Sequence, residues 1–170
     1  CRGLVLDIHK GVVVSACLPK FWNHEEHIQN GWGFPREKPV ITTKYEGGSG
    51  SLLWLHEEPW IATRGSFTSL GAEWATAWFR KHYAMMPRDV RSYWRNPYVT
   101  HIFEIIADCT RIVVQYDFEG LVHLAAIAKE MDVSLWPLHT PLGMRRVMEI
   151  AADDYASLKK LNTENEEGFV

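Results

Sequence analysis

Short apolar runs separated by turn residues fill the first third of the chain, a pattern typical of hairpins. Leu4 to Ile8 and Val12 to Ser15 flank His9-Lys10-Gly11, which predicts a hairpin. The other runs that predict strands here are Val40 to Thr43, Leu52 to Leu55 and Trp60 to Thr63. Between these runs, Phe21 to Lys38 predicts a loop and Gly47 to Gly50 a flexible turn.

The period of the pattern changes after residue 66. Leu70, Trp74, Ala77 and Trp78 recur at helical spacing and predict a helix with one apolar face. The residues before it that could cap this helix are Ser66, Thr68 and Ser69. The Trp74 and Trp78 pair therefore fits a core better than an exposed aromatic platform on which a ligand could stack.

Strand patterns return in the second half. His101 to Ile106 and Arg111 to Tyr116 predict two strands around a turn, whereas Leu121 to Ile127 fits either a strand or a helix. Asp153-Asp154 could cap a helix through residues 158–161, and a last strand begins at Glu167. Many short strands in hairpins, with a few helices between them, predict an antiparallel α+β domain.

Composition sets the class of protein. The 170 residues, 46% hydrophobic and 23% charged, suit one globular domain, with no apolar run long enough to cross a membrane and no signal-peptide pattern. Three cysteines without paired spacing favour a reducing compartment, so we expect a cytoplasmic protein. The net charge of −3 lacks the basic surplus usual for a nucleic-acid binder, although an acidic protein can carry a local basic cleft. The chain opens at Cys1 and stops inside an apolar run, which predicts a piece of a longer protein, truncated at both ends.

The tetrapeptide Lys44-Tyr45-Glu46-Gly47 is the first element that points to chemistry. A lysine at a strand end, followed by an acid and a glycine, can present its amine to a phosphate where the backbone approaches closely. To act as a nucleophile, the amine must lose its proton, which needs desolvation or neighbouring cations. Taken alone, the tetrapeptide fits a solvated surface turn at least as well.

Further elements accompany this tetrapeptide in a fixed order. A glutamate on an apolar strand, such as Glu104, needs a cation or a metal beside it. The ordered elements are Arg2-Gly3, Lys20-Phe21-Trp22-Asn23, Lys44-Tyr45-Glu46-Gly47, Thr63-Arg64-Gly65-Ser66, Phe103-Glu104 followed by Arg111-Ile112-Val113-Val114-Gln115-Tyr116, and Glu167-Gly168-Phe169-Val170.

This ordered set resembles the bacteriophage-type RNA ligases of the covalent nucleotidyltransferase superfamily, over almost the whole chain. The resemblance implies an antiparallel two-sheet core, of the type found in DNA and RNA ligases and capping enzymes, with the nucleotide between the sheets. It also implies an ATP-dependent ligase, with Mg²⁺, that joins 5′-phosphate and 3′-hydroxyl RNA ends, with tRNA among the candidate substrates. We expect a monomer.

The resemblance also assigns roles by position. Lys44 is the nucleophile that attacks the α-phosphate of ATP and carries AMP, which then passes to the RNA 5′-phosphate. Glu104 and Glu167 match the acids that contact ribose and metal, and Glu46 and Gly47 shape the lysine turn. The remaining matches to nucleotide-binding residues are Arg2, Lys20, Trp22 and Arg64.

The chain departs from the family pattern at several points. It has Glu46 where Asp is common, a longer glycine-rich stretch after the nucleophile, and Ala16-Cys17 where relatives often carry Arg-Pro. The last family motif, a pair of lysines, would lie beyond Val170. The alternatives are another polynucleotide adenylyltransferase, of the DNA-end or capping type, and an inactive homologue that binds nucleotide or RNA ends.

Two other features allow more than one interpretation. His24-Glu25-Glu26-His27 has the wrong spacing for a His-Glu-x-x-His zinc helix, so a solvated loop is favoured over a metal site. Tyr116 suits either stacking on adenine or a place in the core.

Overall fold

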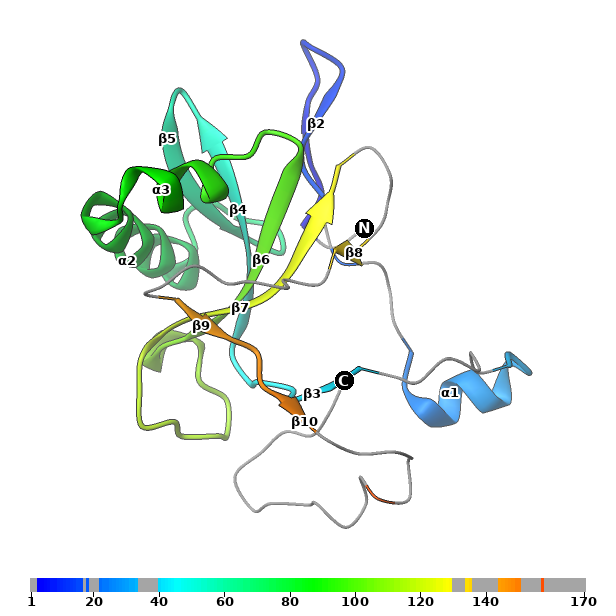
Figure 1. The fold of residues 1–170 in the computed structure, drawn as a ribbon. Coiled ribbons are helices and arrows are strands. Elements are labelled where there is room, and N and C mark those ends of the chain that lie inside the picture. The colour runs from blue at the N-terminus through cyan, green and yellow to red at the C-terminus, as the bar shows by residue number, and fades with distance from the viewer. Residues whose placement is uncertain are drawn as a thin grey trace.

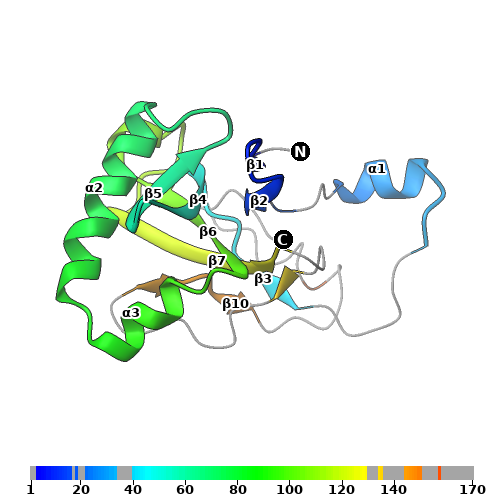
Figure 2. The same ribbon diagram turned by 90° about the horizontal axis from the view of Figure 1, so that it is seen from above.

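The computed structural model is a twisted sheet with its two longest helices on one face and smaller strand pairs on the other (Figures 1 and 2). It describes residues 3–16, 18, 22–33, 40–129, 134–135, 144–150 and 157. The strands are β1 (Val5–Asp7), β2 (Val12–Ser15), β3 (Ile41–Thr42), β4 (Gly48–Leu55), β5 (Glu58–Thr63), β6 (Val99–Ile106), β7 (Gly120–Ala128), β8 (Ser134–Leu135), β9 (Arg145–Arg146) and β10 (Glu149–Ile150). The helices are α1 (His24–Gln29), α2 (Leu70–Met85), α3 (Arg88–Trp94) and the 3-10 turn η1 (Asp108–Thr110).

The central sheet has six strands in the order β5-β4-β6-β7-β8, with β9 also paired to β7. All its pairs are antiparallel except β7 with β9, which is parallel. The β6–β7 ladder shifts register between Ile102 and Phe103, so that β7 carries Leu124 as an extra residue. The antiparallel α+β prediction is therefore confirmed at the level of a mixed fold with an antiparallel central sheet.

Helix α2 covers one face of this sheet. It begins after Ser69, whose side chain accepts a hydrogen bond from the amide of Ala72 at 3.2 Å, as an N-cap does. Its buried face is formed by Ala72, Ala75 and Phe79, which pack with sheet residues from β4 to β7. The predicted helix is confirmed. Of its predicted apolar face, Trp74 and Trp78 are partly buried and pack against the core, as predicted, whereas Leu70 is 74% exposed and Ala77 is also exposed.

The same helix closes the outer edge of β5. In the β4–β5 register, Pro59, Ile61 and Thr63 turn their backbone polar groups outward. The Arg80 side chain donates to the Pro59 carbonyl at 3.0 Å, and the Thr76 hydroxyl accepts from the Ile61 amide at 2.9 Å and donates to its carbonyl at 3.4 Å. Thr63 exchanges two backbone hydrogen bonds with Ser66. Each outward group between Pro59 and Thr63 is thus satisfied.

A pair of histidines lies in the core beneath α3. His101 and His123 are 2% and 0% exposed, and their ring nitrogens lie 3.3 Å apart. His101 also contacts the Tyr93 carbonyl at 3.3 Å, and Trp94 packs edge-on against both rings. Burial lowers the pKa of His101 to about 4 and that of His123 to about 3, so both rings are neutral at pH 7.

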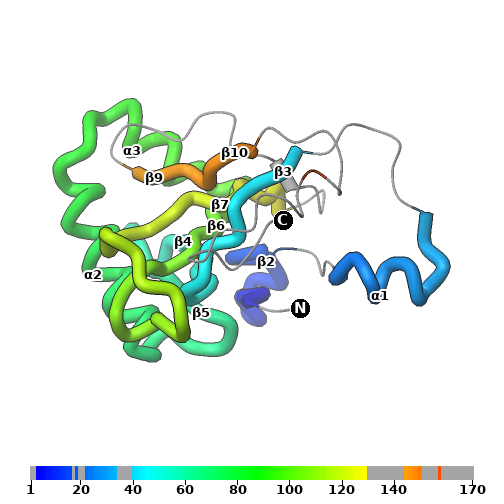
Figure 3. Tube along the Cα trace, turned by 90° about the horizontal axis from the view of Figure 1, so that it is seen from below, coloured from blue at the N-terminus to red at the C-terminus, as the bar shows by residue number. Residues whose placement is uncertain are grey.

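The opposite face of the sheet carries the hairpin β1–β2 at one end and the strand pair β3–β10 at the other (Figure 1), and Figure 3 shows β3 and β10 next to each other. Two apolar clusters attach these segments to the sheet. In the first, Ala16 and Leu18 pack on residues 102, 125 and 127. In the second, Tyr45 and Tyr116 pack on residues 106, 122 and 147.

Several predicted elements differ from the observed ones. Gly48 to Gly50 belongs to strand β4 and not to a flexible turn, since Gly47 and Gly50 fit against β6 and β5 where a side chain would collide. The run from Arg111 to Tyr116 is irregular and not a strand.

Two helices differ from the predictions as well. The segment from Phe21 to Lys38, predicted to be a loop, contains helix α1, which has an Asn23–Glu26 capping box. Helix α3 was not predicted. The ambiguous run from Leu121 is strand β7. The predicted helix through 158–161 and the predicted strand at Glu167 lie outside the described residues. No helix among the described residues is long and apolar enough to span a membrane.

Candidate active site

Glu104 stands on the sheet face opposite α2. Its neighbours in β6, Phe103 and Ile105, both belong to the cluster that packs under α2. Side chains alternate along a strand, so Glu104 points to the other face, where it is half-buried. The prediction that this glutamate sits on an apolar strand is confirmed.

The register of the sheet places two polar residues in one row on that face. Ser49 of β4 lies directly opposite Glu104, and cross-strand partners share a face. Arg64 follows the end of β5 in an exposed turn, next to Thr63, the partner of Gly50. The row on this face is therefore formed by Ser49 of β4 and Glu104 of β6. Ser49 had no predicted role, since the signal for it is the strand register and not a local motif.

The row lies between the two apolar clusters described above. One cluster includes Ile102, two residues before Glu104, and the other includes Ile106, two residues after it. This arrangement leaves a polar strip between apolar walls, which suits a nucleotide, whose base is apolar on its faces and polar on its edges.

Lys44 is brought to this face by its neighbours. It follows β3, where Thr43 donates its amide to the Met148 carbonyl at 3.0 Å. Tyr45 packs in the cluster with Ile106 and Val122, and Val122 is the β7 partner of Glu104. Lys44 is half-buried, and the packing of Tyr45 brings its loop to the sheet face that bears Glu104.

The residue after Tyr45 is fixed by a loop far away in sequence. The Glu46 carboxylate accepts the amides of Val113 and Val114, each at 2.5 Å, and the Glu46 amide donates to the Tyr116 hydroxyl at 2.9 Å. The hydrogen bond from Val113, above all, holds the pKa of Glu46 below its usual value. Burial opposes this shift, while the Val114 and Ile112 amides and the Lys44 charge support it. We call the four residues Glu46, Val113, Val114 and Tyr116 the lysine-loop clamp.

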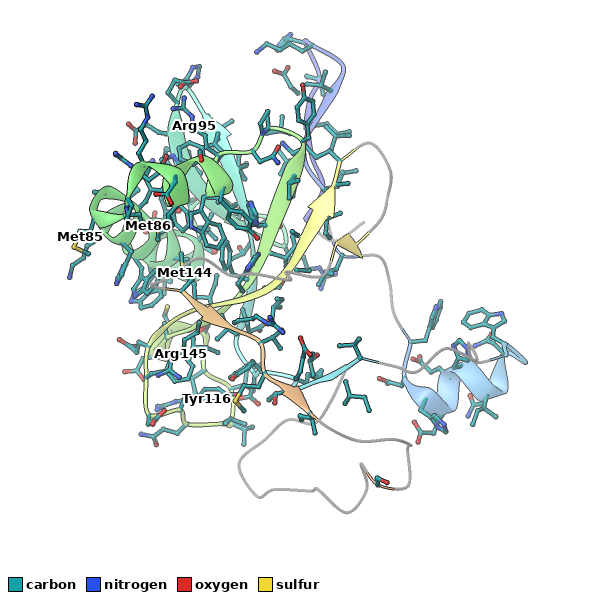
Figure 4. All side chains as sticks on the ribbon, in the orientation of Figure 1. Met85, Met86, Arg95, Tyr116, Met144 and Arg145 are labelled. Carbon is teal, nitrogen blue, oxygen red and sulfur yellow. The ribbon has the colours of Figure 1, made fainter. Side chains whose placement is uncertain are left out.

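The clamp answers the open question about Tyr116. Its hydroxyl is used by the Glu46 amide, and its ring lies 5.6 Å from that of Tyr45, so Tyr116 is an internal contact of the lysine loop. Figure 4 shows Tyr116 and Arg145 at the same end of the sheet, where Arg145 lies over the ring of Phe118. A pocket of about 60 Å³ beside the clamp has room for a few water molecules and not for a nucleotide.

The other predicted site residues are placed less centrally or lie outside the described part. Gly47 packs so closely on β6 that a Cβ there would lie 2.3 Å from the Ile105 carbonyl oxygen. Trp22 is 38% exposed and packs against Trp32 beside α1, which lies apart from the central sheet (Figures 1 and 2). The predicted site residues outside the described residues are Arg2, Lys20 and Glu167.

The segments next to two of these residues do reach the site face. At Gly3, which follows Arg2, an added Cβ would lie 3.6 Å from the Ser51 hydroxyl, and Ser51 lies two residues from Ser49 on β4. The amide of Ala16 donates to the Thr100 hydroxyl at 2.9 Å, which ties the segment before Lys20 to β6.

Comparison with known proteins gives one family. The family model described as RNA ligase matches residues 1–170. No curated protein matches the chain.

Among solved structures, an apo mutant of a Naegleria gruberi RNA ligase is similar, with a TM-score of 0.52 and 11% identity over 76% of this chain and 44% of that chain. A second mutant of a Naegleria gruberi RNA ligase, with ATP and Mn, has a TM-score of 0.51 with the same identity and coverage. These likenesses support the fold, and this chain spans less than half the length of those proteins.

Proposed function

Since this chain belongs to the RNA ligase family, we propose that it is the nucleotidyltransferase part of an ATP-dependent enzyme that joins RNA ends. The observation that carries the proposal is the approach of the Lys44 loop to the sheet face that bears Glu104. Two of the similar Naegleria gruberi structures hold ATP and Mn, which agrees with a nucleotide and a divalent metal as cofactors.

The proposed first step forms a covalent bond between Lys44 and AMP. The neutral Lys44 amine attacks the α-phosphorus of ATP, a nitrogen–phosphorus bond forms, and the bond to the leaving pyrophosphate breaks. AMP then passes to the 5′-phosphate of an RNA, and a 3′-hydroxyl displaces it. In this scheme Glu104 and Ser49 contact the ribose or the metal, and Arg64 contacts a phosphate.

The residues of the row are compatible with Mg²⁺. This ion prefers oxygen ligands and binds through one or two carboxylates, together with water and substrate phosphates. Glu104 and Ser49 offer such oxygens, while no three His, Cys, Asp or Glu side chains come together as a metal cage within the described ranges. When bound, Mg²⁺ would neutralise phosphate charge.

The substrate and assembly state are part of the same proposal. We expect the substrate to be RNA with 5′-phosphate and 3′-hydroxyl ends, with tRNA as a candidate. We expect the protein to act as a monomer. A two-sheet core, in which β3, β10 and neighbouring strands form the second sheet, is supported by the short β3–β10 pair on the site face. Glu167, Lys20 and Arg2 are proposed as further nucleotide contacts on the strength of the motif order.

The test is retention of label from α-labelled ATP by the full-length protein with Mg²⁺. The wild-type protein should form an acid-labile, base-stable adduct, as a phosphoramidate does, and Lys44→Ala should form none. Lys10→Ala is a matched control, because Lys10 is an exposed residue of the β1–β2 turn and should not affect the adduct. Label that persists in Lys44→Ala would remove Lys44 from the mechanism, and no label in the wild-type protein would favour the inactive homologue.

A further inference from the structure

The Lys44 loop has only short anchors of its own. It runs from β3 to β4, and β3 contains two residues, Ile41 and Thr42. Beyond the Thr43 amide, which donates to Met148, the next backbone pairing is that of Gly48 with Ile105. The residues between these anchors include the proposed nucleophile, whose amine must be aimed accurately at the α-phosphorus.

The lysine-loop clamp supplies the missing support from 67 to 70 residues away. Glu46 accepts from two successive amides and donates its own amide to Tyr116, so that it is held at both the side chain and the backbone. Glu46 is 9% exposed, and hydrogen bonds shielded from water fix a geometry more firmly than exposed ones. The residue two places from Lys44 is therefore a firmly held point of the loop.

The contacts of the lysine-loop clamp suit a role in positioning the Lys44 loop. The Glu46 side chain faces the amides of the 112–114 stretch and does not face the row of Glu104, so its charge is used within the protein. Ile112 and Val113 are 76% and 80% exposed, so apolar packing does not explain why this stretch is held in place. The stretch is held by the hydrogen bonds from the Val113 and Val114 amides to Glu46, and by the bond between the Glu46 amide and the Tyr116 hydroxyl.

We infer that Tyr116 is a positioning residue for adenylylation, acting through the Glu46 amide to aim Lys44 at the nucleotide. This inference rests on the proposed function. Tyr116 touches neither ribose nor phosphate in this role. Losing its hydroxyl should slow the chemical step and leave nucleotide binding intact, since the binding groups of the row stay in place.

The experiment compares Tyr116→Phe with the wild-type full-length protein in formation of lysyl-AMP. We expect kcat to fall about tenfold, with KM for ATP within about twofold, because a misplaced nucleophile affects the transition state and not the bound ground state. Tyr98→Phe is the control, since Tyr98 is 68% exposed at the start of β6. Unchanged kcat in Tyr116→Phe would overturn the inference, and so would a rise in KM that accounts for the whole loss.

A second variant separates positioning from loss of folding. Glu46→Gln keeps an acceptor oxygen for the amides and should retain more activity than Glu46→Ala. The melting temperatures of both variants show whether each is still folded. Amide hydrogen exchange without ATP reports on the clamp itself: the Glu46 amide should exchange faster in Tyr116→Phe than in wild type. Equal exchange would overturn the clamp. A wild-type protein that forms no lysyl-AMP, with a protected Glu46 amide, would instead overturn the proposed function.

Discussion

Glu104 combines a polar side chain with apolar neighbours on both sides, and this combination gives a direct test of its role. Glu104→Gln keeps the size of the side chain and its place in β6, so we expect an unchanged melting temperature. AMP transfer should fall by roughly 100-fold, as when one positioned electrostatic group is lost. Rates from single-turnover labelling measure this. Wild-type rates together with an unchanged melting temperature would make Glu104 a structural residue.

Candidate site residues can be proposed from the sequence where they form a local motif. Lys44, with its acid and glycine, is visible as a pattern of residue types, and so is Glu104 between apolar residues. Ser49 was not predictable, because it joins the site through the pairing of β4 with β6. Tyr116 allowed two interpretations, and the deciding contact joins it to Glu46, a residue 70 positions away.

At the scale of elements, α2 and β5 depend on one another through Thr76. Thr76→Val removes the hydroxyl that serves both the amide and the carbonyl of Ile61, leaving those buried groups unpaired. We expect a loss of about 1–2 kcal/mol in the free energy of unfolding, measured by urea denaturation. Thr76→Ser keeps the hydroxyl and should lose less. If Thr76→Val is as stable as the wild-type protein, these hydrogen bonds do not contribute to stability.

Elements were predictable where the apolar period is long, as for α2 and β6. The glycine-rich start of β4 was misassigned to a turn, because local propensity is overridden by close packing: Gly47 and Gly50 lie where a Cβ would meet Ile105 and Ile61. The run after Arg111 was misassigned to a strand. Its backbone amides go to the Glu46 carboxylate, and a side chain has taken the place of a neighbouring strand.

The whole molecule should lose stability in acid through the buried pair His101 and His123. Their folded pKa values, about 4 and about 3, lie below the usual 6.5. Between these folded values and pH 6.5, the unfolded chain therefore binds more protons than the folded protein. The stabilisation is complete above pH 6.5 and is lost as the pH falls towards 4. The loss should be on the order of a few kcal/mol.

Urea unfolding at pH 7 and pH 5 checks this pH dependence. The double variant His101→Phe/His123→Phe should show a much weaker dependence than the wild-type protein. His9→Gln, a change in the exposed β1–β2 turn, should behave as wild type. Equal acid sensitivity in all three proteins would assign the effect to other groups.

The closed edge of β5 also bears on what happens when this protein begins to unfold. A bare edge strand acts as a template on which another chain can pair, and Trp60-Ile61-Ala62 is an apolar, β-prone stretch of this edge. In the native fold, Arg80 and Thr76 occupy the groups that such pairing would use. Helix α2 therefore also protects this edge from pairing with another chain, and loss of the helix with retention of the sheet would expose the edge.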